Sequence, residues 1–424
     1  MSLPLLLTAI LVLFLLRVPM AFAILGPSMA YLLVEGYTLH LGVRLVMQGI
    51  NSWPLLAVPL FILVGIVATR TEIADRLYDA ALLLLGPLRA GLAYVNIAVS
   101  LGFSWMSGAA LADAAGIGSI EVGHMRKNGY PAEFAVGLSA SSAMISPIMP
   151  PSIPAVVYAS VAAVSAGALF VAAVIPAFLM TLALVVTVFL WSRRRPDLVG
   201  QPYNGDAVRR AVVRAIPPIG APVIILGGIL GGFFTPTEAA GVGALYMLLL
   251  AFSYRTMGLR DVAIIFRDTG VISAQIMLII GASTLLSWIL AREQVPQTIA
   301  QSLLGLTDNP AVFLVIVNVV LLACGMLLEP TSALLIITPI LLPIAIQYGV
   351  DPVQLGSIMI FNLMIGLLTP PMGGVVFVLS SVTGIPVERV FRGAAFYLPA
   401  MIAVLLLITY VPALTLWLPE VLGL

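Results

Sequence analysis

The sequence predicts an all-α polytopic membrane protein, and three observations indicate this fold class. Of the 424 residues, 61% are hydrophobic and only 9% are charged, whereas soluble domains carry about 25% charged residues. The mean hydropathy is +1.15. Apolar runs recur from end to end without the period-two alternation of a transmembrane barrel. At about 20 residues per span, they predict about eleven to thirteen membrane segments.

The first apolar run is long enough to be confused with a signal peptide. It continues past Arg17 and Pro19 to Val34 and shows no clear cleavage site, so we expect it to remain as a membrane segment. The single cysteine, Cys324, excludes an internal disulfide framework. A net charge of +1 gives no reason to expect nucleic acid as a partner.

Charge is concentrated in one connection near the middle of the chain. Its basic residues are Arg193, Arg194, Arg195, Arg209, Arg210 and Arg214. The positive-inside rule places this loop in the cytoplasm. We place the basic cytoplasmic connection at residues 201–214, and no other connection is long enough for a folded extramembrane domain.

The chain contains an internal repeat. Pro150-Pro151 and Pro370-Pro371 lie 220 residues apart, as do Gly129 and Gly349, and Asn96 and Asn318 are separated by 222 residues. An ordered series of nearly constant offsets indicates two related halves, residues 1–200 and 215–424. An odd number of crossings per half would make the repeats inverted, as in many secondary transporters.

Each half has the same order of parts. Long apolar segments come first, followed by a polar-faced helix, a hairpin and a proline-broken helix. In the first half, Glu72, Asp75, Arg76 and Asp79 share one helix face, so this helix should lie along the membrane interface. We place the hairpins at about 91–124 and 310–346, and the broken helices at about 132–170 and 353–384.

The prolines predict two broken membrane helices. A proline inside a helix removes one N–H and clashes with the carbonyl four residues earlier, at a cost of roughly 3 kcal/mol. The affected carbonyls belong to Ser146, Pro147, Gly366 and Leu367. Unpaired backbone persists in a membrane only where protein or a wet cavity satisfies it. A bound cation is one such partner, so the matched breaks favour an ion or substrate site over a structural kink.

Two long apolar stretches are interrupted by small or polar residues. The first, residues 91–122, contains "SWMSG", and the second, residues 310–344, contains "LEPTS". Each arm of the first has about 15 residues, or about 22 Å of helix, which is short of the roughly 30 Å membrane core. We therefore expect re-entrant hairpins with tips at mid-membrane. The alternative is a single long span with a polar kink.

Three acids lie in or beside apolar stretches of the chain: Asp113, Glu238 and Glu329. Intramembrane acids indicate function by default, and Glu329, at the second tip, is the strongest candidate. Asp113 is either a coupling residue or a hydrogen-bonded packing group. Glu238 fits better as a helix-start residue capped by Thr235 or Thr237. No nucleophile-elbow, P-loop or HExxH pattern is present, so we expect no enzyme.

At this level of detail the chain resembles the large membrane subunit of TRAP transporters, the tripartite ATP-independent periplasmic transporters of DctM type. Five motifs carry the resemblance in order along the chain: "SGAALADAAGIGSI", "SPIMPPSI", "FTPTEAA", "EPTSALLIITPILLPI" and "GLLTPPMGG". The resemblance implies two inverted repeats that form an elevator-type transport domain moving against a scaffold. It also implies sodium-driven import of a small carboxylate, such as a dicarboxylate or sialic acid, across a bacterial inner membrane.

The partners implied by the resemblance are a small four-helix membrane subunit and a periplasmic substrate-binding protein. At 424 residues we expect the small subunit to be a separate chain. The implied cofactors are two or more sodium ions, with no organic cofactor.

The resemblance also assigns site residues. A first sodium site would use the first tip and first broken helix, largely through carbonyls: Ser104, Ser107, Gly108, Ser146, Met149 and Pro151. A second would use Thr331, Ser332, Gly366, Thr369 and Met372. Substrate would lie between the tips, against Ser107, Ala109, Pro154, Glu329 and Thr331.

The sequence departs from the family pattern at two of these positions. Ala109 stands where a serine often follows Ser-Gly, which removes a hydroxyl near the substrate. Ser146 stands where glycine often precedes the proline, which keeps the carbonyl as a sodium ligand. Two alternatives stay open from the residues: a stand-alone sodium- or proton-coupled anion symporter, and a channel.

Overall fold

The structure is a computed structural model that describes residues 3–16, 18–195, 198, 200, 204–304, 307–371 and 373–424. Within these ranges the chain forms helices and no strands. The all-helical prediction is therefore confirmed.

The first half of the chain contains the following elements: α1 (Leu3–Leu15), α2 (Met20–Val34), α3 (Leu39–Ile50), η1 (Trp53–Leu56), α4 (Ala57–Arg70), α5 (Ile73–Leu85), α6 (Gly91–Ser107), α7 (Ala110–Asp113), η2 (Ala114–Gly118), α8 (Ser119–Lys127), α9 (Ala132–Ser142), α10 (Ile145–Ile148), α11 (Ile153–Ala162) and α12 (Ala166–Ser192). The polar-faced helix predicted near Glu72 is α5.

The second half contains the remaining helices: α13 (Gly205–Leu230), α14 (Pro236–Ser253), α15 (Leu259–Arg292), α16 (Val295–Leu304), α17 (Pro310–Leu327), α18 (Pro330–Gln347), α19 (Pro352–Gly366), α20 (Gly374–Thr383), α21 (Val387–Ala395), α22 (Leu398–Tyr410) and α23 (Ala413–Val421).

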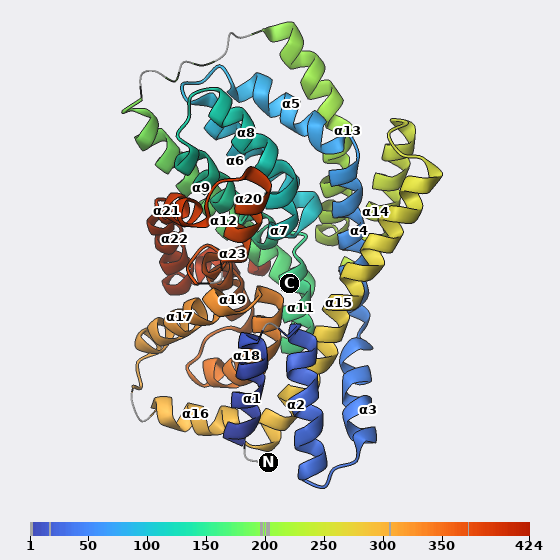
Figure 1. The fold of residues 1–424 in the computed structure, drawn as a ribbon, viewed down its shortest axis with the longest axis vertical. Coiled ribbons are helices and arrows are strands. Elements are labelled where there is room, and N and C mark those ends of the chain that lie inside the picture. Colours follow the sequence, from blue (N-terminus) through green and yellow to red (C-terminus); the bar gives the residue numbers. More distant parts are fainter. Residues whose placement is uncertain are drawn as a thin grey trace.

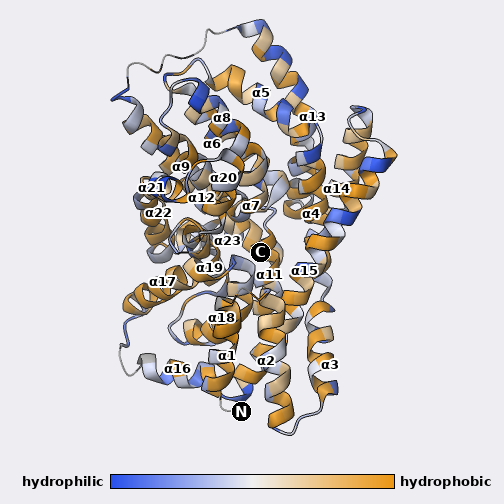
Figure 2. Cartoon of the chain, viewed as in Figure 1, coloured by the Kyte–Doolittle hydropathy of each residue, from blue (hydrophilic) through white to orange (hydrophobic). Residues whose placement is uncertain are grey.

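Seven helices in the described ranges are long and apolar enough to cross a membrane, or up to nine if each of two bent pairs counts as one span. Four further apolar helices have 10–17 residues. The eleven to thirteen predicted segments include short and interrupted apolar runs as well as complete spans. The number of full-length spans is therefore smaller than the number of predicted segments. A multi-pass membrane protein is nevertheless clear, and Figure 2 shows hydrophobic residues along most helices.

The helices form two groups that run side by side along the long axis (Figure 1). We call α3, α4, α13, α14 and α15 the lateral layer; in it, α4 packs against α14 and α15. We call α6–α12 and α17–α23 the central bundle. The two groups meet where α4 packs on α6 and where α15 packs on α18.

Each break divides a helix where the sequence places it. In the first half, α9–α10 and α11 are bent by 42° around Pro150-Pro151. The first broken helix ends at Ala162 and α12 begins at Ala166, so the predicted range 132–170 takes in the first turn of the next helix. In the second half, α19 and α20 flank Pro370-Pro371. Both Pro-Pro peptide bonds are cis.

Buried asparagines join the hairpin arms to the broken helices. Ser142 donates a hydrogen bond of 2.8 Å to Asn96 Oδ1, and Asn362 Nδ2 donates one of 2.7 Å to Asn318 Oδ1. Ser142 and Asn362 lie 220 residues apart, the offset of the Pro-Pro pairs. This correspondence supports the predicted repeat. The membrane orientation of the halves stays a prediction.

Candidate functional site

The first interruption is a tight turn between α6 and α7. Gly108 has φ +63° and Ala109 is extended, so the chain leaves one helix and enters the next within two residues. A Cβ atom at Gly108 would lie 2.7 Å from Pro151 O. Glycine therefore permits both the left-handed backbone and the close approach of this tip to the broken helix.

The first Pro-Pro break carries its own cap. Ser152 Oγ accepts a hydrogen bond of 3.2 Å from the Ala155 N–H at the start of α11. The same hydroxyl donates one of 2.5 Å to Pro147 O. One of the carbonyls that proline leaves without a helical partner is thus satisfied by a side chain rather than left for a cation.

The second interruption lies between α17 and α18. Leu328 is extended, and Glu329 caps α18 by accepting a 3.0 Å hydrogen bond from the Ser332 N–H. The Thr331 hydroxyl donates a 2.9 Å bond to the other carboxylate oxygen of Glu329. The sequence predicted this break but not that the carboxylate of Glu329 organises the start of the following helix.

The second Pro-Pro break also depends on close backbone packing. A Cβ atom at Gly366 would lie 2.4 Å from the carbonyl carbon of Gly325 on α17. Thr369 Oγ1 donates a 2.8 Å hydrogen bond to Gly366 O, which also accepts the Thr369 N–H at 3.0 Å. The Gly366 carbonyl, expected to be free for sodium, is therefore already bonded. Met372 lies outside the described residues.

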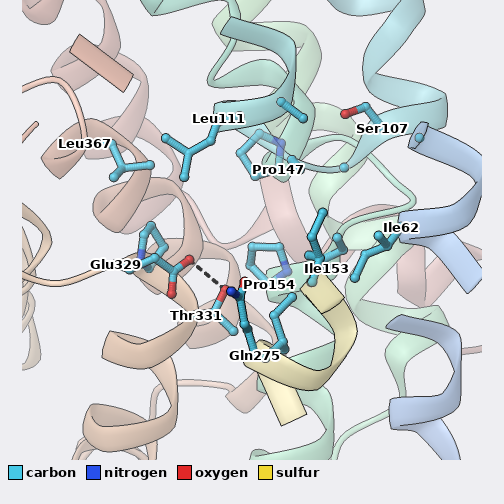
Figure 3. A pocket seen from close by; sticks show the side chains of 18 of the residues that line it. Ile62, Ser107, Leu111, Pro147, Ile153, Pro154, Gln275, Glu329, Thr331 and Leu367 are labelled. Carbon is cyan, nitrogen blue, oxygen red and sulfur yellow. Dashed lines mark hydrogen bonds between the residues drawn. The ribbon is translucent and has the colours of Figure 1, made fainter. Parts of the chain in front are cut away.

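A pocket of about 530 Å³ lies between the two tips. All five residues predicted to contact substrate line it: Ser107, Ala109, Pro154, Glu329 and Thr331. Figure 3 shows Ser107 at the upper right, and Glu329 and Thr331, joined by their hydrogen bond, below it and to the left, with Pro154 beside Thr331. The structure thus brings together residues more than 200 positions apart. Substrate binding by them stays a prediction.

Two polar lining residues were missed by the sequence reasoning. Gln275 on α15 and Thr69 on α4 both line the pocket, and Figure 3 shows Gln275 beside Thr331. Gln275 carries the only carboxamide in the otherwise apolar and hydroxyl-containing run from Val271 to Leu290, which is the signal that could have identified it. These two residues also show that the pocket lies between the lateral layer and the central bundle.

The lining of this pocket is apolar except for a few groups. Its polar side chains are Thr69, Ser107, Gln275, Glu329 and Thr331. Among the described residues that line it, none is basic. An anion in this pocket would thus have to be met by hydroxyls, by the carboxamide, by helix N-termini or by a cation bound alongside.

The residues assigned to the first sodium site gather around the first break. Gly108 lies against Pro151, and Met149, between α10 and α11, is extended and buried. The Ser146 hydroxyl is fully buried, and among the described residues it forms no ordinary hydrogen bond, although it lies near the Asp113 carboxylate. Ser104 instead donates to Leu101 O at 2.6 Å within its own helix. A buried oxygen without a partner fits a cation ligand.

Asp113 and Glu238 lie in different environments. Asp113 is only 4% exposed. Ser107 and Ser146 approach its carboxylate, yet within the described part of the chain neither carboxylate oxygen forms an ordinary hydrogen bond. It therefore lies beside the first ion-site residues without being satisfied. Glu238 forms a capping box with Thr235 at the start of α14 and does not line the pocket, which confirms its interpretation as a helix-start residue.

The residues assigned to the second sodium site differ from those of the first because their hydroxyl groups already form hydrogen bonds within the protein. The hydroxyls of Thr331 and Ser332 both contact Glu329, at 2.9 Å and 3.3 Å, and Thr369 bonds to Gly366. Within the described part of the chain these side chains are thus satisfied by one another. A cation here would have to share or replace these bonds, whereas at Ser146 it would fill an open position.

The comparisons with known proteins agree with this architecture. The model of the family described as "Tripartite ATP-independent periplasmic transporter, DctM component" matches residues 7–414. The sialic acid TRAP transporter large permease protein SiaM of Vibrio cholerae is 39% identical over 404 residues, which cover 95% of each chain. The C4-dicarboxylate TRAP transporter large permease protein DctM of Pseudomonas aeruginosa is 39% identical over 375 residues, or 88% of each chain.

A solved structure shares the fold at much lower sequence similarity. The YdaH transporter of Alcanivorax borkumensis, described as having an unusual topology, aligns with a TM-score of 0.57 and 14% identity. The alignment covers 90% of this chain and 87% of that chain. The family match and the permease relatives lead to one conclusion: the chain belongs to the DctM family of tripartite ATP-independent periplasmic transporters and is a membrane transport protein rather than an enzyme.

Proposed function

We propose that this chain is the large permease of a sodium-coupled importer for a small organic anion. The anion, a carboxylate of the dicarboxylate or sialic acid type, is delivered by a periplasmic binding protein and crosses a bacterial inner membrane. A separate four-helix membrane chain completes the assembly. The relatives named for sialic acid and C4-dicarboxylates support the carboxylate class.

One observation carries the proposal: the two helix breaks meet at a single pocket between the lateral layer and the central bundle. Helix N-termini carry partial positive charge, and α11 and α18 both begin at this pocket, near Pro154 and Thr331. These N-termini suit a carboxylate. Glu329 is suited to a different part of the substrate, a hydroxyl or an amine, because it would repel a second carboxylate.

Sodium would supply the positive charge that the pocket lining lacks. The Ser146 hydroxyl, the carbonyls near Pro151 and the Ser107–Gly108 turn would hold one ion, with the Asp113 carboxylate balancing its charge. The residues Thr331, Ser332 and Thr369 would hold another. Since cation and anion would then lie close together, each would favour the binding of the other, and uptake would require both.

The position of the pocket also suits an elevator mechanism. Its walls come from α4 and α15 on one side and from the hairpin tips on the other. Sliding of the central bundle against the lateral layer would carry the tips, with substrate and ions between them, toward the opposite membrane face. In a channel the same breaks would instead line a continuous path.

Sodium coupling is tested by uptake of labelled sialic acid and of a labelled dicarboxylate into proteoliposomes holding all three components. We expect an inward sodium gradient to be required. We expect Thr369→Ala and Ser107→Ala to weaken the sodium dependence by about tenfold, the effect of losing about 1.4 kcal/mol. The matched control is Thr187→Ala, whose hydroxyl donates only to Ala183 O within its own helix.

Three results would change this account. Uptake at the same rate with and without a sodium gradient would show that transport is not coupled to sodium. Sodium-dependent uptake by this chain alone would indicate a stand-alone symporter. Single-channel currents without saturable uptake would indicate a channel.

The close approach of the first tip to the broken helix is tested by Gly108→Ala. The left-handed backbone disfavours alanine by roughly 1–2 kcal/mol, and the added methyl would collide with the Pro151 carbonyl at 2.7 Å. We expect sodium-dependent uptake to fall by about tenfold or more. Gly102→Ala is the control, because nothing lies within 4 Å of a Cβ there. Equal uptake by the two variants would show that the tip contact is not needed.

The role of Glu329 is tested by separating its helix cap from its charge. Glu329→Ser keeps a good N-cap, whereas Glu329→Ala removes the cap at a cost of about 1 kcal/mol. We expect uptake to fall about tenfold in both variants and thermal stability to fall only in Glu329→Ala. Glu238→Ala, which breaks a capping box away from the pocket, should leave uptake unchanged. Normal uptake by Glu329→Ser would reduce Glu329 to a structural cap.

A further inference from the structure

A second cavity, unrelated to the transport pocket, opens between α6 and α12. It has a volume of about 710 Å³. Its apolar walls are Ile97, Ala98 and Leu101 on α6, and Val185, Val186 and Phe189 on α12. We call this cavity the α6–α12 groove. Val186 is 45% exposed and Phe189 is 47% exposed, so the groove is open at the outer surface of the protein rather than enclosed.

Two arginines stand at one end of this groove. Arg89 and Arg193 both line it and are exposed. Arg89 donates to the carbonyl oxygens of Arg193 and Arg195, at 3.4 Å and 3.2 Å, which fixes it at the end of α12. The Arg193 guanidinium lies 4.6 Å from the centre of the Phe189 ring. In the described part of the chain, neither arginine forms an ion pair with a carboxylate.

Besides the arginines, the described polar residues that line the groove are Tyr94, Thr181 and Ser192. The Thr181 hydroxyl donates to Ala177 O, and the Ser192 hydroxyl donates to Phe189 O, within their own helix. The donors that remain for a ligand are thus the two arginines and the Tyr94 hydroxyl, which lies near the start of α6, five residues after Arg89. A compact polar solute would lose its hydration along the apolar walls without gaining partners. A long alkyl chain would match the apolar walls, and an anionic head group would match the two arginines at the end of the groove.

The length of the groove matches one membrane leaflet. From Thr181 to Arg193, α12 rises about 18 Å at 1.5 Å per residue, and half of the hydrocarbon core is about 15 Å. The arginine end also lies at the start of the basic connection, which the positive-inside rule places at the cytoplasmic face. The arginines are therefore at the level of lipid headgroups when the apolar walls are at the level of acyl chains.

We propose that the α6–α12 groove is a binding site for an anionic phospholipid of the cytoplasmic leaflet. One acyl chain lies between α6 and α12, and the phosphate is bound by Arg89 and Arg193. Since α6 leads directly to Ser107 and Gly108 at the first tip, a lipid here packs against an arm of the transport site. This inference does not depend on the substrate or on sodium coupling.

The test is lipid binding to the delipidated protein in detergent, measured by native mass spectrometry with phosphatidylglycerol and phosphatidylcholine of identical chains. A surface arginine contributes about 1 kcal/mol toward anionic lipid, or about fivefold in affinity. We expect tighter binding of phosphatidylglycerol and about fivefold weaker binding in each of Arg89→Gln and Arg193→Gln. Arg194→Gln is the matched control, because Arg194 does not line the groove.

The acyl-chain part of the site is tested separately. Val186→Trp fills the groove and should reduce binding of phosphatidylglycerol, whereas Leu245→Trp, at an exposed position of α14 that does not line the groove, should not. Because Val186 and Leu245 are 45% and 59% exposed, both variants should fold. Should Arg89→Gln fail to fold, Arg193→Gln carries the headgroup test.

Three outcomes would overturn the proposal. The first is equal affinity for the two lipids. The second is wild-type binding by Val186→Trp, which would place the lipid on the surface outside the groove. The third is equally effective competition by soluble glycerol 3-phosphate, which would reduce the site to a phosphate site without an acyl chain.

Discussion

A backbone polar group inside a membrane needs a partner, and the structure depends on how this chain meets that requirement at two breaks. At the first break the Ser152 hydroxyl satisfies Pro147 O. At the second, the Thr369 hydroxyl satisfies Gly366 O. At each break a neighbouring hydroxyl thus replaces one of the helical hydrogen bonds that the Pro-Pro pair removes. Because the two interruptions face one pocket, polar groups gather there rather than against lipid.

Both halves use side-chain hydroxyls to satisfy a carbonyl at the break, but the acidic residues near the two tips differ in their surroundings. Glu329 at the second tip caps α18 and accepts hydrogen bonds from the hydroxyls of Thr331 and Ser332. At the first tip the acid, Asp113, is buried, and the hydroxyls of Ser107 and Ser146 are the groups that approach its carboxylate. Under the proposed sodium coupling, a cation at the first break would meet the Ser146 hydroxyl and the Asp113 carboxylate, whereas at the second break it would have to replace bonds that the side chains make to one another. The two proposed ion sites would therefore be unequal.

The features that the sequence predicted are those with local causes. Proline disfavours a helix interior, and glycine permits the turn at Gly108, so both interruptions could be located from the residues. Proline alone does not decide a break, because Pro217 and Pro218 lie inside the continuous helix α13. Other features arise from packing between distant helices. Gln275 reaches the pocket because α15 passes beside α18, and the buried Glu121 accepts a hydrogen bond from Asn96 because α8 packs against α6. Neither contact follows from spacing along the chain, nor does the α6–α12 groove.

The central claim is that substrate occupies the pocket between the two tips, and thiol protection tests it most directly. In a Cys324→Ser background, Ala109→Cys and Thr331→Cys would be alkylated with and without saturating sialic acid or dicarboxylate, in the presence of sodium. Leu182→Cys, on the exposed surface of α12, is the control. The account predicts that a transported substrate slows alkylation at both pocket positions and not at the control. Unchanged rates at positions 109 and 331 with a substrate that is demonstrably transported would contradict it.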